Sequence, residues 1–227
     1  MKALILMAAF LLSFTSLALC DDAISPERLA MSVSGGYSHM IGHADPSFFP
    51  HDAFYIDMQV LLRVPNVEVP IVSAPLWLGI GSSISSYTTS EDVSGFIGGQ
   101  FVDASLDSSF TLVSVEARAA IPIRFGPRHG FFVTPSIGAG LLIDNYSFNT
   151  LTFPGENDAR AGGPDTRRQG DHAGLAFCLR PTIAVGYSWE HWQLGGEASY
   201  VAAWGDFGEF GGNVQELHAG LFVRFVY

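Results

Sequence analysis

Eight charged residues lie inside otherwise apolar stretches of this sequence, and their side chains have the most capacity for chemistry. They comprise four acids and four arginines: Asp57, Glu116, Glu197 and Glu216, and Arg63, Arg118, Arg180 and Arg224. A charge that is removed from water without a partner costs several kcal/mol, so charges buried together must form ion pairs. The equal numbers therefore predict a paired network, with a narrow ion path or a proton relay as the alternatives.

The spacing of these charges places them on one face of extended strands. Glu116 and Arg118 are two residues apart, and side chains at such a spacing point to the same side of a strand. The residues between the charges are apolar, as in Phe54, Ile56 and Met58 around Asp57. Alternating strands with one polar and one apolar face must therefore position the charges.

Eight such alternating segments can be marked, and no helical period competes with them. They are residues 29–38, 53–64, 76–88, 110–125, 131–148, 172–187, 192–204 and 215–227. The connections between them alternate in length: long (41–52), medium (65–75), long (89–109), short (126–130), long (149–171), short (188–191) and long (205–214). This order fits an up-and-down barrel with short turns on one rim and long loops on the other, as in transmembrane β-barrels.

Either face could point outward in a closed barrel. A soluble lipocalin-like barrel would keep its apolar face inside, around a ligand. The aromatic residues favour a membrane barrel, because such barrels carry an aromatic girdle at each interface. Tyr37, Phe54, Tyr87, Phe110, Tyr146, Phe148, Tyr200 and Trp204 gather near the long loops, and Trp77, Phe125, Phe131, Tyr187, Trp189, Trp192, Phe225 and Tyr227 gather near the short turns.

The first residues are typical of an export signal. Lys2 is followed by an apolar run over residues 3–12, and Ala18 and Cys20 fit a small-x-small cleavage site. We therefore predict a signal peptide at 1–20, a short periplasmic segment at 21–28 and a barrel domain at 29–227. The alternatives are a retained membrane anchor and a lipobox in which Cys20 is acylated.

The C-terminal segment alternates strictly and ends on an aromatic residue. Its apolar face carries Leu221, Val223, Phe225 and Tyr227, which resemble the C-terminal insertion signal of bacterial outer-membrane barrels. With eight strands and an export signal, the chain resembles the small OmpA/OmpX-type barrels over nearly its whole mature length. The resemblance implies an all-β, eight-stranded antiparallel up-and-down transmembrane barrel, located in the bacterial outer membrane. It also implies that the last strand closes the barrel against residues 29–38.

Two other kinds of chemistry can be weighed from the residues. His39, His43 and His51 share the first long loop with Asp45 and Asp52, but their spacing matches no closed metal-ligand motif. A hydrolase needs a serine within hydrogen-bond reach of a histidine, and no single predicted strand carries such a pair. We therefore expect no metal site, no cofactor and no catalytic residue, and a lipid-modifying enzyme remains a weaker alternative.

The composition limits the partners. Acidic residues number 22 against 11 Lys and Arg, which argues against a nucleic-acid partner. Charged residues make up 15% of the chain and the mean hydropathy is +0.28, although no long apolar block follows the signal. We expect a monomer that contacts outer-membrane lipid and lipopolysaccharide, and that meets the barrel-assembly machinery through its last strand. A structural or surface-interaction role through acidic external loops is the main hypothesis, and a narrow channel is the alternative.

Overall fold

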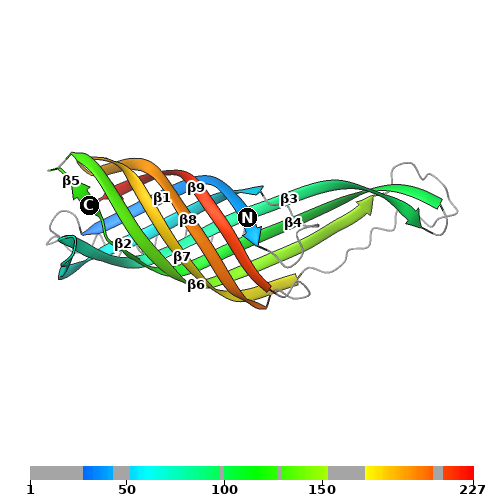
Figure 1. Cartoon of the computed structure of the whole chain (residues 1–227), viewed down its shortest axis with the longest axis horizontal. Coiled ribbons are helices and arrows are strands. Elements are labelled where there is room, and N and C mark those ends of the chain that lie inside the picture. The colour runs from blue at the N-terminus through cyan, green and yellow to red at the C-terminus, as the bar shows by residue number, and fades with distance from the viewer. Residues whose placement is uncertain (1–27, 43–51, 98–99, 127–128, 153–171, 207–211) are drawn as a thin grey trace.

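The computed structural model describes residues 28–42, 52–97, 100–126, 129–152, 172–206 and 212–227. Neighbouring strands are antiparallel, in the order β4-β3-β2-β1-β9-β8-β7-β6-β5, and a further β4–β6 pairing closes the sheet into a barrel (Figure 1). The strands are β1 (Leu29–Gly42), β2 (Asp52–Val69), β3 (Ala74–Ile97), β4 (Gln100–Ala120), β5 (Ile123–Phe125), β6 (Gly130–Thr152), β7 (His172–Trp189), β8 (Trp192–Asp206) and β9 (Gly212–Val226).

The short strand β5 continues the line of β4, so the barrel wall has eight positions. Both strands pair with β6, and Ile121 between them donates its amide to the Pro135 carbonyl at 3.0 Å. Pro122 has no amide hydrogen to add to a ladder, which accounts for the interruption. The predicted eight-stranded antiparallel barrel is confirmed, with one difference: the expected strand 110–125 is broken at residues 121–122.

The first and last strands close the barrel, as predicted. Strands β1 and β9 are paired from Ala30 opposite Val226 to Met40 opposite Glu216. Beyond the end of β9, the Tyr227 carbonyl accepts hydrogen bonds from the amides of Arg28 and Leu29, at 2.7 and 3.0 Å. The Tyr227 amide donates to the Leu29 carbonyl at 2.7 Å, so the terminal residue fastens the seam through its backbone.

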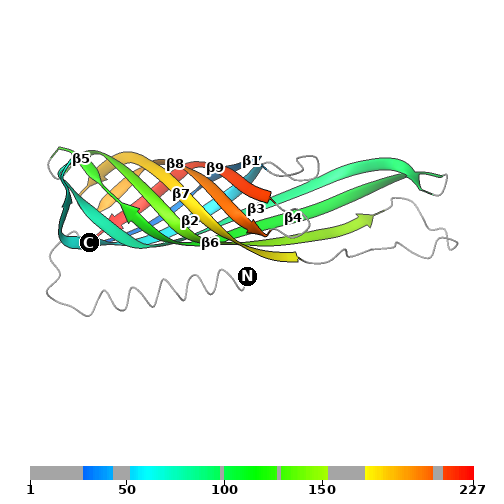
Figure 2. The same ribbon diagram turned by 60° about the horizontal axis from the view of Figure 1, so that its bottom comes forward.

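Two connections differ from the prediction. The expected loop 89–109 is an extension of the β3–β4 hairpin, paired from Thr89 opposite Ser108 to Ile97 opposite Gln100. This extension projects beyond the barrel (Figures 1 and 2). At the other rim β2 runs to Val69 and β3 begins at Ala74, so the expected turn 65–75 is a short connection. Asn66 and Ser73 take positive φ values of 59° and 49° near it.

The two faces of the barrel wall differ sharply in polarity. On β7 the outward-facing Leu175, Phe177 and Ile183 are 56%, 49% and 50% exposed, whereas the inward-facing Cys178 and Arg180 are 0% and 2% exposed. A soluble ligand-binding barrel would have the reverse arrangement. Each rim carries exposed aromatic residues on its outer side, including Tyr37, Phe54 and Trp204 on one and Phe125, Phe131, Trp189, Trp192 and Tyr227 on the other.

Three aromatic residues assigned to these girdles lie inside the barrel instead. Trp77, Tyr87 and Phe110 are 4%, 0% and 4% exposed. The side chains of Tyr146 and Phe148 lie outside the described residues. The predicted signal peptide 1–20 and all of segment 21–28 except Arg28 also lie outside them. Within the described ranges, no helix is long and apolar enough to cross a membrane.

Candidate functional site: the charged lumen

An ion-pair cluster occupies the middle of the barrel interior. The Arg118 Nη2 atom lies 2.5 Å from Asp57 Oδ1, and Nη1 lies 2.7 Å from Oδ2, so the carboxylate accepts two parallel hydrogen bonds. Both side chains are almost fully buried. The pairing spans strands β4 and β2, with β3 between them. Such bidentate pairs are the strongest charge-assisted hydrogen bonds in proteins.

Arg180 reaches this pair from β7. Its Nη1 atom lies 3.1 Å from Asp57 Oδ1, and its Nε atom lies 3.0 Å from Glu116 Oε1. Glu116 in turn lies 3.1 Å from Arg118 Nε. Arg180 also donates to the hydroxyls of Ser83 and Ser114. Two carboxylates and two guanidiniums thus form a closed group, the central cluster: Asp57, Glu116, Arg118 and Arg180.

Two glycines make room for the central cluster. A Cβ atom at Gly81 would clash with the Arg118 side chain, and one at Gly138 would clash with the Glu116 carboxylate. Both glycines lie in strands, Gly81 in β3 and Gly138 in β6. Their function is to let long charged side chains lie flat against the barrel wall.

Glu216 forms a separate polar group nearer the long-loop rim. Tyr87 donates a hydrogen bond to its carboxylate, Ser38 donates another at 3.4 Å, and His218 Nε2 lies 3.4 Å from Oε2. The His218 ring stacks on Tyr55, with 4.4 Å between centroids. Among the described residues, the groups that hold Glu216 are therefore hydroxyls and an imidazole rather than an arginine.

The structure brings a serine to this histidine that the sequence did not indicate. Ser85 Oγ lies 3.5 Å from His218 Nε2, although β3 and β9 are far apart in the chain. In a nucleophilic triad the serine and the acid face different ring nitrogens. Here both face Nε2, and His218 is 2% exposed. The arrangement is that of a packed polar core rather than an accessible nucleophile.

Glu197 is bound by hydroxyl groups. The Ser34 hydroxyl donates to its Oε1 atom at 2.5 Å, and the Tyr55 hydroxyl donates to the same atom at 3.3 Å. Tyr55 also stacks on His218, so this carboxylate is connected to the Glu216 group through one aromatic ring.

Two of the predicted network arginines lie elsewhere. Arg63 keeps an inward position in the alternation of β2, but it is exposed, because it lies at the open rim beyond the last β1–β2 pair, Leu29 and Leu62. The prediction that Arg63 joins the buried network is therefore wrong. Arg224 is 4% exposed and lies outside the central cluster: it donates to Gln193 Oε1 at 3.3 Å, and the Phe222 ring centroid lies 5.1 Å from its guanidinium carbon.

Apolar layers close the lumen on both sides of the charges. Toward the long-loop rim, inward side chains from seven strands form one buried cluster: Met40, Tyr87, Phe110, Leu112, Leu142, Ala176, Cys178, Val201, Ala203 and Val214. Toward the turns, Phe132, Ala184 and Phe222 form a second cluster, and Ala30, Leu61, Trp77, Ala120 and Val226 form a third. An eight-stranded barrel has an interior that side chains can fill.

The predicted insertion-signal residues lie on the outer face of β9 or directly after it. Leu221, Val223 and Tyr227 are 73%, 45% and 50% exposed. Phe225 is partly covered by Trp192, whose ring centroid lies 5.0 Å away. The four side chains thus form an apolar strip along the outside of the seam.

The histidine-rich first loop is only partly described. His39 Nδ1 lies 2.7 Å from Asp52 Oδ1, and Tyr37 donates to the same carboxylate. His43, Asp45 and His51 lie outside the described residues. Within the described part of the chain, no group of three ligating side chains could hold a metal ion.

Comparison with known proteins identifies the architecture. The crystal structure of Neisserial surface protein A (NspA) matches with a TM-score of 0.50 and 13% identity, covering 90% of this chain and all of that one. The chain has the eight-stranded fold of the small OmpA/OmpX-like barrels. Ail, the attachment invasion locus protein of Yersinia pestis, matches this small-barrel fold with a TM-score of 0.44 and 13% identity, covering 88% of this chain and all of that one.

Sequence comparisons add no family to this assignment. No family model matches the chain, and no curated protein matches it in sequence. The small-barrel assignment therefore depends on the strand order, the closure and the similarity to NspA.

Proposed function

We propose that this chain is an integral outer-membrane β-barrel protein that presents its long-loop rim to the cell surroundings and does not conduct ions. The observation that carries the proposal is the polarity of the wall: apolar side chains cover the outside, and charged side chains are paired inside. A large exposed apolar surface needs a cover, and a lipid bilayer covers a closed barrel all round.

The membrane supplies the first set of partners in this proposal. The apolar outer wall contacts outer-membrane lipid and lipopolysaccharide, and the exposed aromatics at the rims lie at the interfaces. The strip of Leu221, Val223, Phe225 and Tyr227 meets the barrel-assembly machinery after the signal 1–20 has been removed. Within the described barrel wall each strand position is paired on both sides, which supports a monomer.

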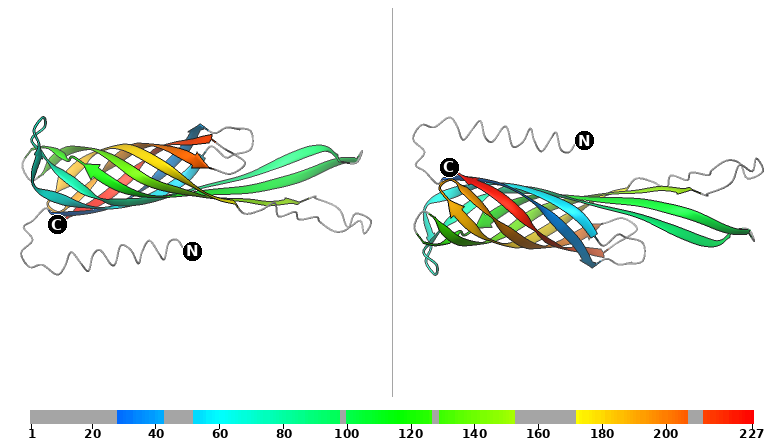
Figure 3. Two further views of the ribbon diagram at one scale, coloured as in Figure 1. Left: turned by 90° about the horizontal axis from the view of Figure 1, so that it is seen from below. Right: turned by 90° about the horizontal axis from the view of Figure 1, so that it is seen from above.

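The β3–β4 hairpin is the main surface for interaction in this proposal. Its paired strands β3 and β4 project beyond the barrel wall (Figure 3). The extended part carries Glu91, Asp92, Asp103 and Asp107, so its charge favours a cationic partner surface. NspA, which shares the fold, is named as a surface protein.

Cysteine labelling in intact cells tests which rim faces outward. Ser94→Cys lies in the hairpin extension, and Ile71→Cys lies in the short connection of the opposite rim, where Ile71 is 93% exposed. Cys178 is fully buried and gives little background. We expect a membrane-impermeant maleimide to label Ser94→Cys in intact cells, and Ile71→Cys only after lysis. Labelling of Ile71→Cys alone in intact cells would reverse the orientation.

Single-channel recording tests the closed lumen. Purified barrel in a planar bilayer should give no discrete conductance steps, because paired charges and three apolar clusters fill the interior. Reproducible steps that scale with protein concentration would instead support the narrow-channel alternative. A denatured sample of the same protein serves as the control for detergent artefacts.

A further inference from the structure

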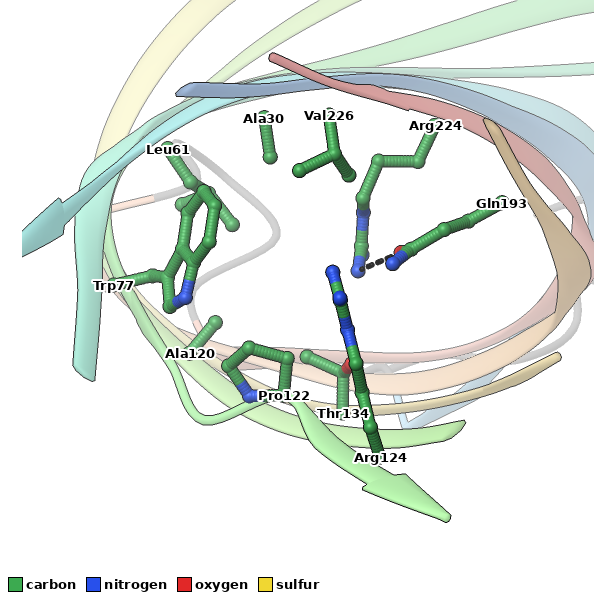
Figure 4. Close-up of a pocket in the computed structure, with 10 residues that line it drawn as sticks. All are labelled: Ala30, Leu61, Trp77, Ala120, Pro122, Arg124, Thr134, Gln193, Arg224 and Val226. Carbon is green, nitrogen blue, oxygen red and sulfur yellow. Dashed lines mark hydrogen bonds between the residues drawn. The ribbon is translucent and has the colours of Figure 1, made fainter. Parts of the chain in front are cut away.

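A small pocket inside the turn-side end of the barrel contains two arginines and no carboxylate. It is lined by Ala30, Leu61, Trp77, Ala120, Pro122, Arg124, Thr134, Gln193, Arg224 and Val226. The guanidinium groups of Arg124 and Arg224 point toward one another beside Gln193 (Figure 4). Two like charges repel when they converge in this way. An anion between them would attract both guanidiniums, and these two attractions would outweigh the repulsion.

Arg224 is the buried residue of this pocket that most favours an anionic ligand. It is 4% exposed and permanently charged. Among the described residues, no carboxylate lies within ion-pair distance of it, and its Nε atom has no hydrogen-bond partner. The central cluster shows the contrast, because there each guanidinium faces two carboxylates.

Further unused donors surround the same space. Within the described part of the chain, neither Trp77 Nε1 nor Thr134 Oγ1 has a hydrogen-bond partner, although both atoms are buried. Such groups are normally paired with protein, water or a ligand. All three unpartnered groups can donate hydrogen bonds, which is the requirement for an oxygen-rich anion.

A larger pocket adjoins the first and opens it to the rim. It shares Trp77, Pro122 and Arg124 with the inner pocket and adds Arg63, and its volume of about 650 Å³ includes open solvent at the rim. No carboxylate lines either pocket among the described residues, in a chain with 22 Asp and Glu against 11 Lys and Arg. Arg63, Arg124 and Arg224 line these two pockets from the rim inward, and we call them the arginine series.

We propose that this arginine series binds a phosphate group at the turn-side mouth of the barrel. The phosphate would enter through the larger pocket and lie against Arg63 and Arg124. One of its oxygens would reach the inner donors Arg224 Nε and Trp77 Nε1. Guanidinium groups suit this ligand, since their fixed fork of N–H groups matches phosphate oxygens. A free phosphate and a phospholipid headgroup share this chemistry.

Thermal unfolding of the detergent-refolded full barrel tests the site. Sodium phosphate, compared with sodium chloride at equal ionic strength, should raise the midpoint by about 2–4 °C at about five times its Kd. Arg124→Gln and Arg224→Gln should abolish this rise. The control variant Arg28→Gln removes an exposed charge from the same rim, outside both pockets. It should keep the phosphate-dependent rise of the midpoint. A parallel titration with short-chain phosphatidylglycerol distinguishes a headgroup from free phosphate, and a rise with either supports the site.

Two results would overturn the proposal. One is a wild-type midpoint that does not respond to either phosphate source beyond the chloride control. The other is a response that persists in both Arg124→Gln and Arg224→Gln. Without phosphate, Arg224→Gln should fold with an unchanged or higher midpoint, because it removes an uncompensated charge. If that variant fails to fold, Arg63→Gln replaces it, with the same loss of response expected.

Discussion

Replacing Asp57 with alanine should lower the free energy of unfolding by about 3–5 kcal/mol, as for other buried ion pairs that lose one partner. A single oxygen of Asp57, Oδ1, accepts hydrogen bonds from both Arg118 and Arg180. Without Asp57 the central cluster keeps three charges, and Glu116 is the one carboxylate left in it to pair with two guanidiniums. Urea unfolding of barrels folded in lipid vesicles, followed by tryptophan fluorescence, measures the change.

Asp52→Ala is the matched control for this prediction. Asp52 also contacts a basic side chain, His39 at 2.7 Å, but its own side chain is 63% exposed. Exposed pairs of this kind contribute about 0–1 kcal/mol, so the control should change little. Equal effects of the two substitutions would mean that the central cluster does not stabilise the barrel.

Deleting residues 225–227 should abolish most folding, both in cells and in purified lipid. The deletion removes the three backbone hydrogen bonds between Tyr227 and residues 28–29, and the ladder pairs of Phe225 and Val226 with β1. It also removes Val226 from the buried cluster that closes the turn-side end. An unclosed barrel leaves unpaired strand edges that bilayers do not tolerate. The folded fraction, measured after refolding into vesicles, reports the loss.

Tyr227→Ala separates the seam from the insertion signal. This variant keeps the backbone bonds and removes the exposed aromatic ring. Under the proposed function, the assembly machinery recognises the strip in cells but takes no part in refolding into purified lipid. We therefore expect near-normal refolding in purified lipid and reduced assembly in cells. Normal folding of the 225–227 deletion would contradict the role of the seam.

The periodicity of the sequence predicted the architecture because alternation is a local property. The polar face of each strand can be identified from that strand's own residues, and the short connections indicate which strands are neighbours in the barrel. The closure of β9 against β1 followed from counting eight segments. Asp57, Glu116, Arg118 and Arg180 were recognisable as inward-facing for the same reason, and all four are buried.

The partners of each charge could not be predicted, since contacts across a lumen depend on register between distant strands. Alternation places Arg63 on the same face of the strand as Asp57, but it does not say how far along the barrel axis each side chain lies. Arg63 lies at the rim and is exposed. Ser85 and His218 meet only because β3 and β9 face each other inside the barrel. The hairpin extension at 89–108 was hidden because its many Ser, Gly and Asp residues are typical of loops.

Refolding of the mature chain with and without phospholipid vesicles tests the central claim most directly. The claim is that the apolar face points outward into lipid while the charges pair inside. Unboiled samples should migrate differently from boiled samples on a gel only when vesicles were present. Identical migration of boiled and unboiled samples after refolding with vesicles, or equal folding in plain buffer, would contradict the account.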